Sequence, residues 1–256
     1  MPAPKNHFKA ALKQGQRQIG CWCALADPYA IEVLASAGFD WLVIDGEHGP
    51  NDLRSIVAQL QILEDKASHA VVRLPVGEDW MIKQVLDAGA QTLLIPMVES
   101  AAQARALVRA MRYPPNGIRG VGAGLGRASR FSQITDYMET AEAELCLLVQ
   151  VESKKGVDAL DDILAVDGVD GVFVGPYDLS TDLGHPGQLD HPDVEPILEA
   201  ALKKISASSK ASGSLAVSDE TRAQYHAWGT QFLAVAVDIT MLASAARTQA
   251  DRWKAY

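Results

Sequence analysis

The chain has 256 residues, of which 48% are hydrophobic and 21% charged, a composition typical of one globular domain with a large core. Its formal net charge of −9 predicts no nucleic-acid partner, because such a surface needs basic side chains that neutralise phosphates. Cys21, Cys23 and Cys146 are too few for a disulfide framework, and no apolar run is long enough to cross a bilayer. We therefore expect reduced core thiols, no membrane partner and a cytoplasmic location.

Short apolar runs alternate with helical patterns along the chain, as they do in a series of βα units. The runs are nearly continuous, which is typical of parallel strands covered on both faces. Eight such strands close a barrel, so we predict an α/β fold: a single-domain (β/α)8 TIM barrel over residues 1–256, with an N-terminal helical segment before the first strand. The predicted strands are 19–25, 41–45, 70–74, 92–98, 145–152, 171–175, 214–217 and 232–237.

The helices between these strands carry their own start and stop signals. Asp27 and Pro28 provide an N-cap and a proline in the first turn, and Gly38 would end that helix. Ser100 and Ser218 are predicted N-caps of two later helices. The connection 111–143 is longer than a linking loop requires, and long barrel loops are often functional.

Polar side chains stand where several predicted strands end. In a TIM barrel the carboxyl ends of all strands meet at one rim, which carries the active site. The side chains expected there are Asp45, His48, Arg73, Gln150, Glu152 and Asp178.

Glu152 and Asp178 follow adjacent predicted strands, so one cation could bridge them. Two carboxylates without a soft ligand suit a divalent ion such as Mg²⁺, Mn²⁺ or Co²⁺ that retains waters and accepts substrate oxygens. The alternative is that each carboxylate only stabilises the N-terminus of a helix. Their placement as a pair favours a metal site.

His48 lies three residues after Asp45 in a turn flanked by glycines. An aspartate bonded to one imidazole nitrogen would fix the tautomer and make the other nitrogen a better base. The alternative is an exposed loop histidine. Arg73 interrupts an apolar strand, and a buried guanidinium needs an anionic partner, either a substrate or a structural carboxylate.

Other charged residues give weaker indications. Asp87 lies in the last turn of the predicted helix 78–88, where a negative charge opposes the helix dipole, so we expect a tertiary partner. The segment 119–130 combines glycines with three arginines, and either a second anionic group or a neighbouring subunit could contact it. The lysines lie outside the strands, which disfavours a Schiff-base mechanism.

Four stretches resemble the HpcH/HpaI aldolase family: WLVIDGEH at 41–48, VRLP at 72–75, LVQVE at 148–152 and DGVFVGPYDLS at 170–180. The resemblance runs through nearly the whole chain. It implies that His48 is the base with Asp45 as its orienting partner, that Arg73 stabilises the transition state, and that Glu152 and Asp178 bind the metal.

The resemblance also implies that Gln150 and the main chain around Tyr177 bind substrate. It implies that Asp87 supports the histidine, from a neighbouring subunit, and that the assembly is a hexamer. One departure from the family pattern is Tyr177, which stands where relatives often have a small residue. A larger side chain there would reshape the aldehyde pocket.

The activity implied is that of a metal-dependent pyruvate aldolase. It would cleave 4-hydroxy-2-oxo acids, of the 4-hydroxy-2-oxoheptanedioate type, reversibly to pyruvate and an aldehyde. Two related alternatives are a sugar-acid aldolase of the 2-dehydro-3-deoxyglucarate type and a lyase of CoA thioesters of the citrate lyase β subunit type. A barrel that binds small acids without catalysis is a third.

Overall fold

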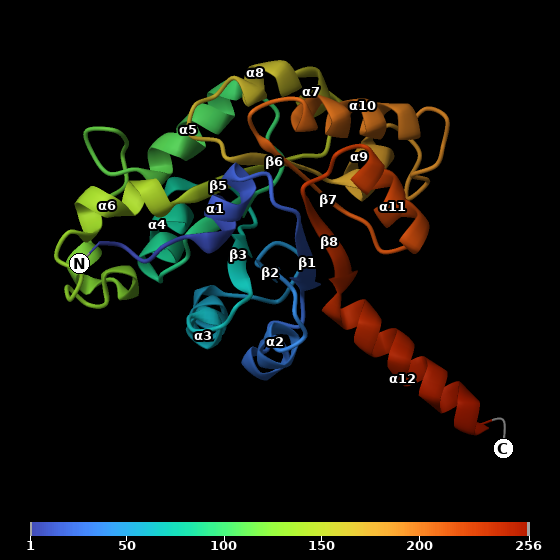
Figure 1. Ribbon diagram of the computed structural model, residues 1–256, viewed down its shortest axis with the longest axis horizontal. Helices are drawn as coiled ribbons and strands as arrows, with labels where there is room; N and C mark the ends of the chain where they lie inside the picture. Colours follow the sequence, from blue (N-terminus) through green and yellow to red (C-terminus); the bar gives the residue numbers. More distant parts are fainter. Residues whose placement is uncertain (1, 255–256) are drawn as a thin grey trace.

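The computed structural model describes residues 2–254 and shows a closed barrel of eight parallel strands (Figure 1). Each strand pairs with the next along the chain, and β8 returns to pair with β1. The strands are β1 Gln18–Cys23, β2 Trp41–Asp45, β3 His69–Arg73, β4 Thr92–Ile95, β5 Cys146–Val151, β6 Gly171–Val174, β7 Ala211–Leu215 and β8 Phe232–Val237. The predicted TIM barrel is confirmed.

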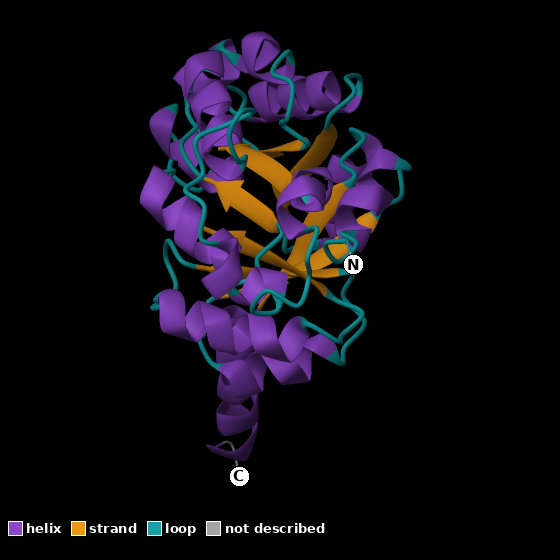
Figure 2. Cartoon of the chain, turned by 90° about the vertical axis from the view of Figure 1, so that its left-hand side faces the viewer, coloured by secondary structure: helices purple, strands orange, loops and turns teal. Residues whose placement is uncertain are grey.

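Helices surround the barrel, as Figure 2 shows. They are α1 His7–Lys13, α2 Pro28–Ala35, α3 Leu53–Leu63, α4 Asp79–Asp87, α5 Ala101–Met111, α6 Tyr137–Glu144, α7 Lys154–Asp158, α8 Leu160–Leu164, α9 Pro176–Asp182, α10 Glu195–Ser206, α11 Asp219–Ala227 and α12 Asp238–Lys254, with 3-10 turns η1 Ala123–Leu125 and η2 Arg127–Ser129. No helix among residues 2–254 combines the length and apolar character needed to cross a membrane.

The sequence signals for helix ends operate as expected. Asp27 caps α2 by accepting a hydrogen bond from the Ala30 amide, and Pro28 opens the helix. Ser100 and Ser218 cap α5 and α11 in the same way. Helix α2 ends at Ala35, and Gly38 adopts a φ of 93°, a conformation that glycine reaches without strain, as the chain turns toward β2.

Side chains alternate between the barrel interior and the helix layer along each strand. On β1, Trp22 packs inside with Trp41, while Cys21 and Cys23 face the helices as buried free thiols. Phe8 of α1 contacts the rings of Trp41 and Phe232, so α1 closes the amino-terminal end of the barrel. The predicted core thiols are confirmed.

The seventh strand is the one whose boundaries differ most from the prediction. It begins at Ala211, three residues before the predicted start. Its first residues are small, and Gly213 faces the ring of Phe232, whose atoms would lie 2.2 Å from any Cβ at that position. Small residues give a weak hydrophobic signal, and here the large neighbour in β8 fills the space.

The long connection 112–136 lies at the amino-terminal end of the barrel. It follows α5, which runs back from the carboxyl end of β4, and it precedes α6 and β5. Residues of this connection and of α6 line a cavity together with His69 and Ala70, which begin β3. The connection is therefore far along the barrel axis from the rim predicted to carry the chemistry.

Candidate functional site

The predicted active-site side chains continue the inward-facing rows of the barrel at its carboxyl end. Asp45 follows Trp41 and Val43 at every second position of β2, and Arg73 follows Val71 on β3. Asp45 and Arg73 are register partners on adjacent strands. Gln150 occupies the corresponding level of β5. Period-two alternation thus delivers polar groups to the last interior layer without disturbing the apolar layers beneath.

A buried arginine is held at this level by two carboxylates. Arg73 Nε donates to Asp45 Oδ1 at 2.8 Å, and its Nη2 donates to Asp45 Oδ2 at 2.7 Å. Its Nη1 lies 2.6 Å from Glu47 Oε2. The guanidinium carbon lies 4.6 Å from the centre of the Trp22 ring, whose Nε1 also donates to Asp45. Loss of either partner of a buried pair of this kind costs about 3–5 kcal/mol of stability.

These contacts shift the two carboxyl groups in opposite directions. Burial acts to raise the pKa of Asp45, but the hydrogen bonds and positive charge of Arg73 outweigh it and lower the pKa below its usual value. Burial raises the pKa of Glu47, although the charges of Arg73 and His48 oppose the shift. Asp45 thus favours the charged form that binds Arg73, whereas Glu47 takes up a proton more readily.

The expected bond between Asp45 and the His48 imidazole is absent, so that prediction is wrong in this structure. Asp45 uses its oxygens on Arg73, on Trp22 and on the backbone amides of Glu47 and His48, the last at 3.3 Å. His48 lies exposed in the turn after β2. Arg73 outcompetes the imidazole because its planar, charged fork matches both carboxylate oxygens at once. Asp45 positions the backbone that carries His48 rather than its ring.

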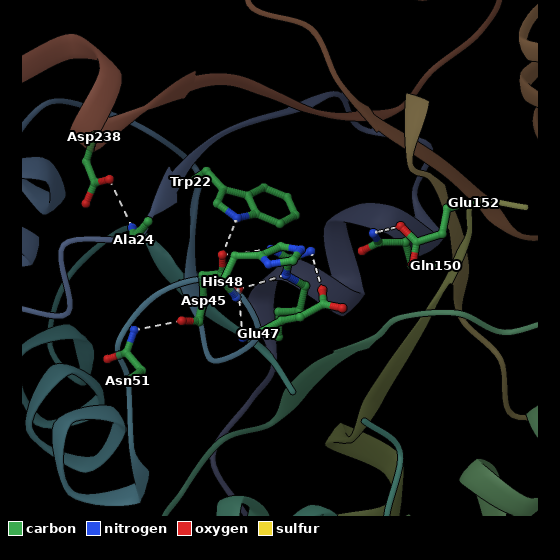
Figure 3. Close-up of polar contacts among 10 residues, drawn as sticks. Trp22, Ala24, Asp45, Glu47, His48, Asn51, Gln150, Glu152 and Asp238 are labelled. Atoms are coloured by element: carbon green, nitrogen blue, oxygen red, sulfur yellow. Dashed lines mark hydrogen bonds and ion pairs between the residues drawn. The ribbon is translucent and has the colours of Figure 1, made fainter. Parts of the chain in front are cut away.

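Glu152 is the second buried anion of the rim, and Figure 3 shows it with Gln150 across from the group formed by Asp45, Glu47 and His48. Its Oε1 accepts a hydrogen bond from the Met97 amide at 2.8 Å, and its Oε2 accepts one from the Gln150 amide group. Met97 has a φ of 53°, an uncommon conformation for a side chain of its size, and it aims its N–H at this carboxylate.

Gly175 leaves the space that Glu152 occupies. A Cβ at position 175 would lie 2.5 Å from Glu152 Oε2 and 3.2 Å from Gln150 Nε2. The φ of Gly175 is −82°, so the backbone there is open to any residue. The glycine is required by this close approach alone.

Tyr177 and Asp178 lie next to this group, in the first turn of α9 directly after β6. Both are exposed, with Tyr177 at 43%. The negative charge of Asp178 acts to raise the pKa values of Glu47 and Glu152, which places the three carboxyl groups within electrostatic reach of one another. The structure thus brings Asp178 to the same rim as Glu152, as predicted.

The residues at this rim fit a divalent cation. Burial raises the pKa of Glu152, with the negative charges of Asp178 and Glu47 adding to the shift, so a cation held here would stabilise the charged form of Glu152. Gln150 Oε1 is buried and has no hydrogen-bond partner, which leaves a further oxygen donor beside Glu152. Carboxylate and amide oxygens are donors that Mg²⁺ and Mn²⁺ prefer.

Asp87 is not brought to this rim. It ends α4, before β4 begins, so it lies at the amino-terminal end of the barrel. Its Oδ1 accepts a hydrogen bond from Arg119 Nη2 at 2.6 Å. The tertiary partner expected from its unfavourable helix position is therefore Arg119. Arg127 and Arg130 of the same segment both pair with Glu64. Within one chain, the arginines of the segment 119–130 therefore cannot contact an anionic group of a substrate bound at the rim.

Two cavities lie away from the rim, at the amino-terminal end of the barrel. Cavities of about 290 and 310 Å³ adjoin His69 at the amino end of β3, and none of the predicted catalytic side chains lines either of them. The charged and polar side chains converge at the opposite end, where the strands finish.

Sequence reasoning assigned no role to four residues that build the site. Glu47 stood in the recognised rim sequence, and its charge beside a buried arginine was the available signal. Trp22 falls within the first predicted strand, and Gly175 ends the sixth. The sequence gives no sign of the role of Met97, because a methionine side chain does not favour a left-handed backbone conformation.

Comparisons with known proteins cover the whole barrel. A family model described as HpcH/HpaI aldolase/citrate lyase matches residues 18–245. The hydroxypyruvate/pyruvate aldolase of Roseovarius nubinhibens is 62% identical over 254 residues, with 99% of each chain covered. The 4-hydroxy-2-oxo-heptane-1,7-dioate aldolase of Escherichia coli is 49% identical over 251 residues, covering 98% of this chain and 96% of its own. A solved family structure from Burkholderia cenocepacia J2315 has a TM-score of 0.94 at 39% identity, covering 98% of this chain and 100% of its own.

Proposed function

The chain belongs to the HpcH/HpaI aldolase/citrate lyase family and is an aldolase, a carbon–carbon lyase; from this premise we propose that it is a class II enzyme that uses a divalent cation at Glu152 and Asp178 to form and cleave pyruvate aldols. The observation that carries the proposal is the buried carboxyl group of Glu152, whose pKa burial and the charge of Asp178 raise. The amide oxygen of Gln150 lies buried without a hydrogen-bond partner and offers a further ligand. An anionic cluster of this kind is stabilised when a cation joins it.

Glu152 and Asp178 would hold the cation, with Gln150 beside them. When bound, the ion supplies a Lewis acid that polarises the 2-oxo group of the substrate. Gln150 and the main chain around Tyr177 would contact the substrate carboxylate. Glu152 is rigid, because the Met97 amide and the Gln150 amide both bind it and Gly175 packs against it.

Arg73 supplies fixed positive charge for the developing enolate. A guanidinium has five N–H groups. Three are directed at Asp45 and Glu47, so two remain for a substrate oxygen. Because Asp45, Glu47 and Trp22 hold the group in place, Arg73 stabilises the negative charge without reorganisation, which is the basis of electrostatic catalysis.

His48 carries the proton. In the cleavage direction it removes the C4 hydroxyl proton, directly or through a water, as the C3–C4 bond breaks and an aldehyde leaves. The same group returns a proton in the synthetic direction. Its exposed position after β2 leaves the imidazole free to reach a substrate.

The acid partner is a short 2-oxo acid, either pyruvate or hydroxypyruvate. The relative with 62% identity carries both names, whereas the heptanedioate aldolase that we expected as the nearest match is 49% identical. We therefore propose that 4-hydroxy-2-oxoheptanedioate is one of several aldols cleaved. Tyr177 borders the position of the aldehyde and restricts its size.

We further propose that the enzyme is a homo-oligomer, a hexamer by family resemblance. Asp87 lies at the opposite end of its own barrel, so it can support a histidine only in a neighbouring copy. Helix α12 extends away from the barrel (Figure 1) and exposes Ile239, Met241 and Leu242 at 40–60%. A second copy of the chain would cover these apolar side chains.

A coupled assay tests the proposed function. Pyruvate release from a panel of 4-hydroxy-2-oxo acids is followed with lactate dehydrogenase, before and after chelation and after re-addition of Mg²⁺, Mn²⁺ or Co²⁺. We expect activity to vanish with chelator, to return with metal, and to fall at least about 100-fold in His48→Ala. Turnover that persists after complete metal removal contradicts the metal mechanism, and ligand binding without any turnover favours a non-catalytic barrel. His226→Ala is the matched histidine control.

A further inference from the structure

Two histidines and an aspartate meet in the loop between α9 and α10, among residues that the proposed chemistry does not use. His185, His191 and Asp193 each offer a ligand atom, and these atoms lie within 4.8 Å of one another. His185 Nε2 lies 3.4 Å from Asp193 Oδ2, and His191 Nδ1 lies 3.7 Å from the same oxygen. We propose that these side chains form a second metal site that binds a divalent transition ion of the Zn²⁺ type.

The spacing of the three ligand atoms fits such an ion. Zn²⁺ binds imidazole nitrogen and carboxylate oxygen at about 2.0–2.2 Å in tetrahedral geometry. Two ligands of a tetrahedral ion then lie roughly 3.4 Å apart, which follows from those bond lengths. The distances of 3.4 and 3.7 Å to the Asp193 carboxylate match this separation. Water would complete the coordination shell.

The two imidazole rings must turn when the ion binds. They are stacked with centroids 3.5 Å apart and an interplanar angle of 19°. A metal lies in the plane of each ring that ligates it, so at least one ring rotates about its χ2 bond. The ion would also replace the hydrogen bond that the Asp193 amide donates to His191 Nδ1. Both changes are confined to side chains that are partly exposed.

The backbone of the loop is already fixed in place for this site. The His185 amide donates to Ser180 O at 2.8 Å, and the His185 carbonyl accepts from the Gln188 amide at 3.1 Å. The His191 amide donates to Gln188 O, and its carbonyl accepts from the Val194 amide at 2.8 Å. Because consecutive turns hold both histidines, little backbone entropy is lost on binding.

The ligands of the loop site favour a different kind of ion from the ligands at the rim. Two imidazole nitrogens and one carboxylate favour Zn²⁺, Cu²⁺, Ni²⁺ or Co²⁺, whereas Glu152 and Asp178 offer oxygen only and suit harder ions. An ion in the loop would join the two ends of the segment that links α9, which carries Asp178, to α10. It would therefore stabilise the folded chain by an amount that rises with the logarithm of the free ion concentration once this exceeds the dissociation constant.

Zinc titration tests the second metal site in a variant that lacks the two carboxylates proposed to bind metal at the rim. The full-length Glu152→Gln/Asp178→Asn variant is stripped with chelator and titrated with Zn²⁺ by calorimetry. We expect one equivalent of Zn²⁺ to bind and the melting temperature to rise with zinc concentration. Cobalt in place of zinc should give the visible absorption bands of a nitrogen-ligated ion.

Adding His185→Ala or His191→Ala to this background should weaken Zn²⁺ binding more than about tenfold and abolish the cobalt bands. His7→Ala, an exposed histidine in the N-terminal segment, is the matched control and should change neither. Asp193→Asn, at a position with a side chain 73% exposed, removes a ligand with little risk to folding. No bound zinc in the double variant, or equal zinc affinity in the His7, His185 and His191 variants, would overturn the proposal.

Discussion

Gly175→Ala is the smallest change that would displace the carboxylate of Glu152. The φ of −82° accommodates alanine without backbone strain, so any effect must come from contact with neighbouring side chains. The new Cβ would lie 2.5 Å from Glu152 Oε2 and 2.9 Å from Glu152 Cβ, whereas ordinary contact begins near 3.4 Å. Because the Met97 amide and the Gln150 amide hold the carboxylate, it cannot move aside freely.

The carboxylate must therefore shift by roughly 0.9 Å, the difference between the two distances. A misplacement of about 1 Å at a catalytic group costs on the order of 100-fold in rate. This corresponds to about 2.7 kcal/mol of transition-state stabilisation. Overpacking should also lower the free energy of unfolding by about 1–3 kcal/mol.

Two measurements check this reasoning. Initial rates of pyruvate release across a range of Mg²⁺ or Mn²⁺ concentrations report kcat/KM and the metal requirement, and urea unfolding reports stability. A folded Gly175→Ala enzyme with wild-type kcat/KM and metal affinity would refute the role assigned to Glu152.

Three further predictions concern the charged groups of the rim. Arg73→Lys should lower the free energy of unfolding by about 3 kcal/mol in a urea titration, since an ammonium cannot bind Asp45 at two points and also reach Glu47. A loss below about 0.5 kcal/mol would show that these contacts of Arg73 contribute little to stability. The pKa of Glu152 is higher in the folded chain than its unfolded value of 4.5, so the folded chain binds a proton that the unfolded chain releases. In the presence of chelator, the free energy of unfolding should therefore fall as the pH rises from 4.5 through the folded-state pKa. Glu152→Gln should flatten this part of the melting-temperature curve, and curves that run parallel to wild type would contradict the shift. Trp22→Phe keeps a ring against Arg73 but removes the indole N–H bond to Asp45, so it should cost about 1 kcal/mol in thermal unfolding, with a change near zero as the contrary result.

Much of this protein follows from the sequence by itself. Eight apolar runs of strand length predict eight parallel strands, and parallel strands bring their carboxyl ends to one rim. That argument placed Asp45, Arg73, Gln150, Glu152 and Asp178 together without any knowledge of distances. It succeeds because strand direction and period-two alternation are local properties, which each segment encodes independently.

The tertiary structure alone decided which of these groups are partners. Asp45 lies three residues from His48, yet Arg73 of the neighbouring strand takes both of its carboxylate oxygens. The negative charge of Asp87 is unfavourable at the end of its helix, and the residue that pairs with it, Arg119, lies 32 residues further along the chain. The glycine at 175 and the left-handed backbone at Met97 are required only by a carboxylate on another strand. Such choices depend on competition among groups that meet only after the barrel closes, so no local pattern can encode them.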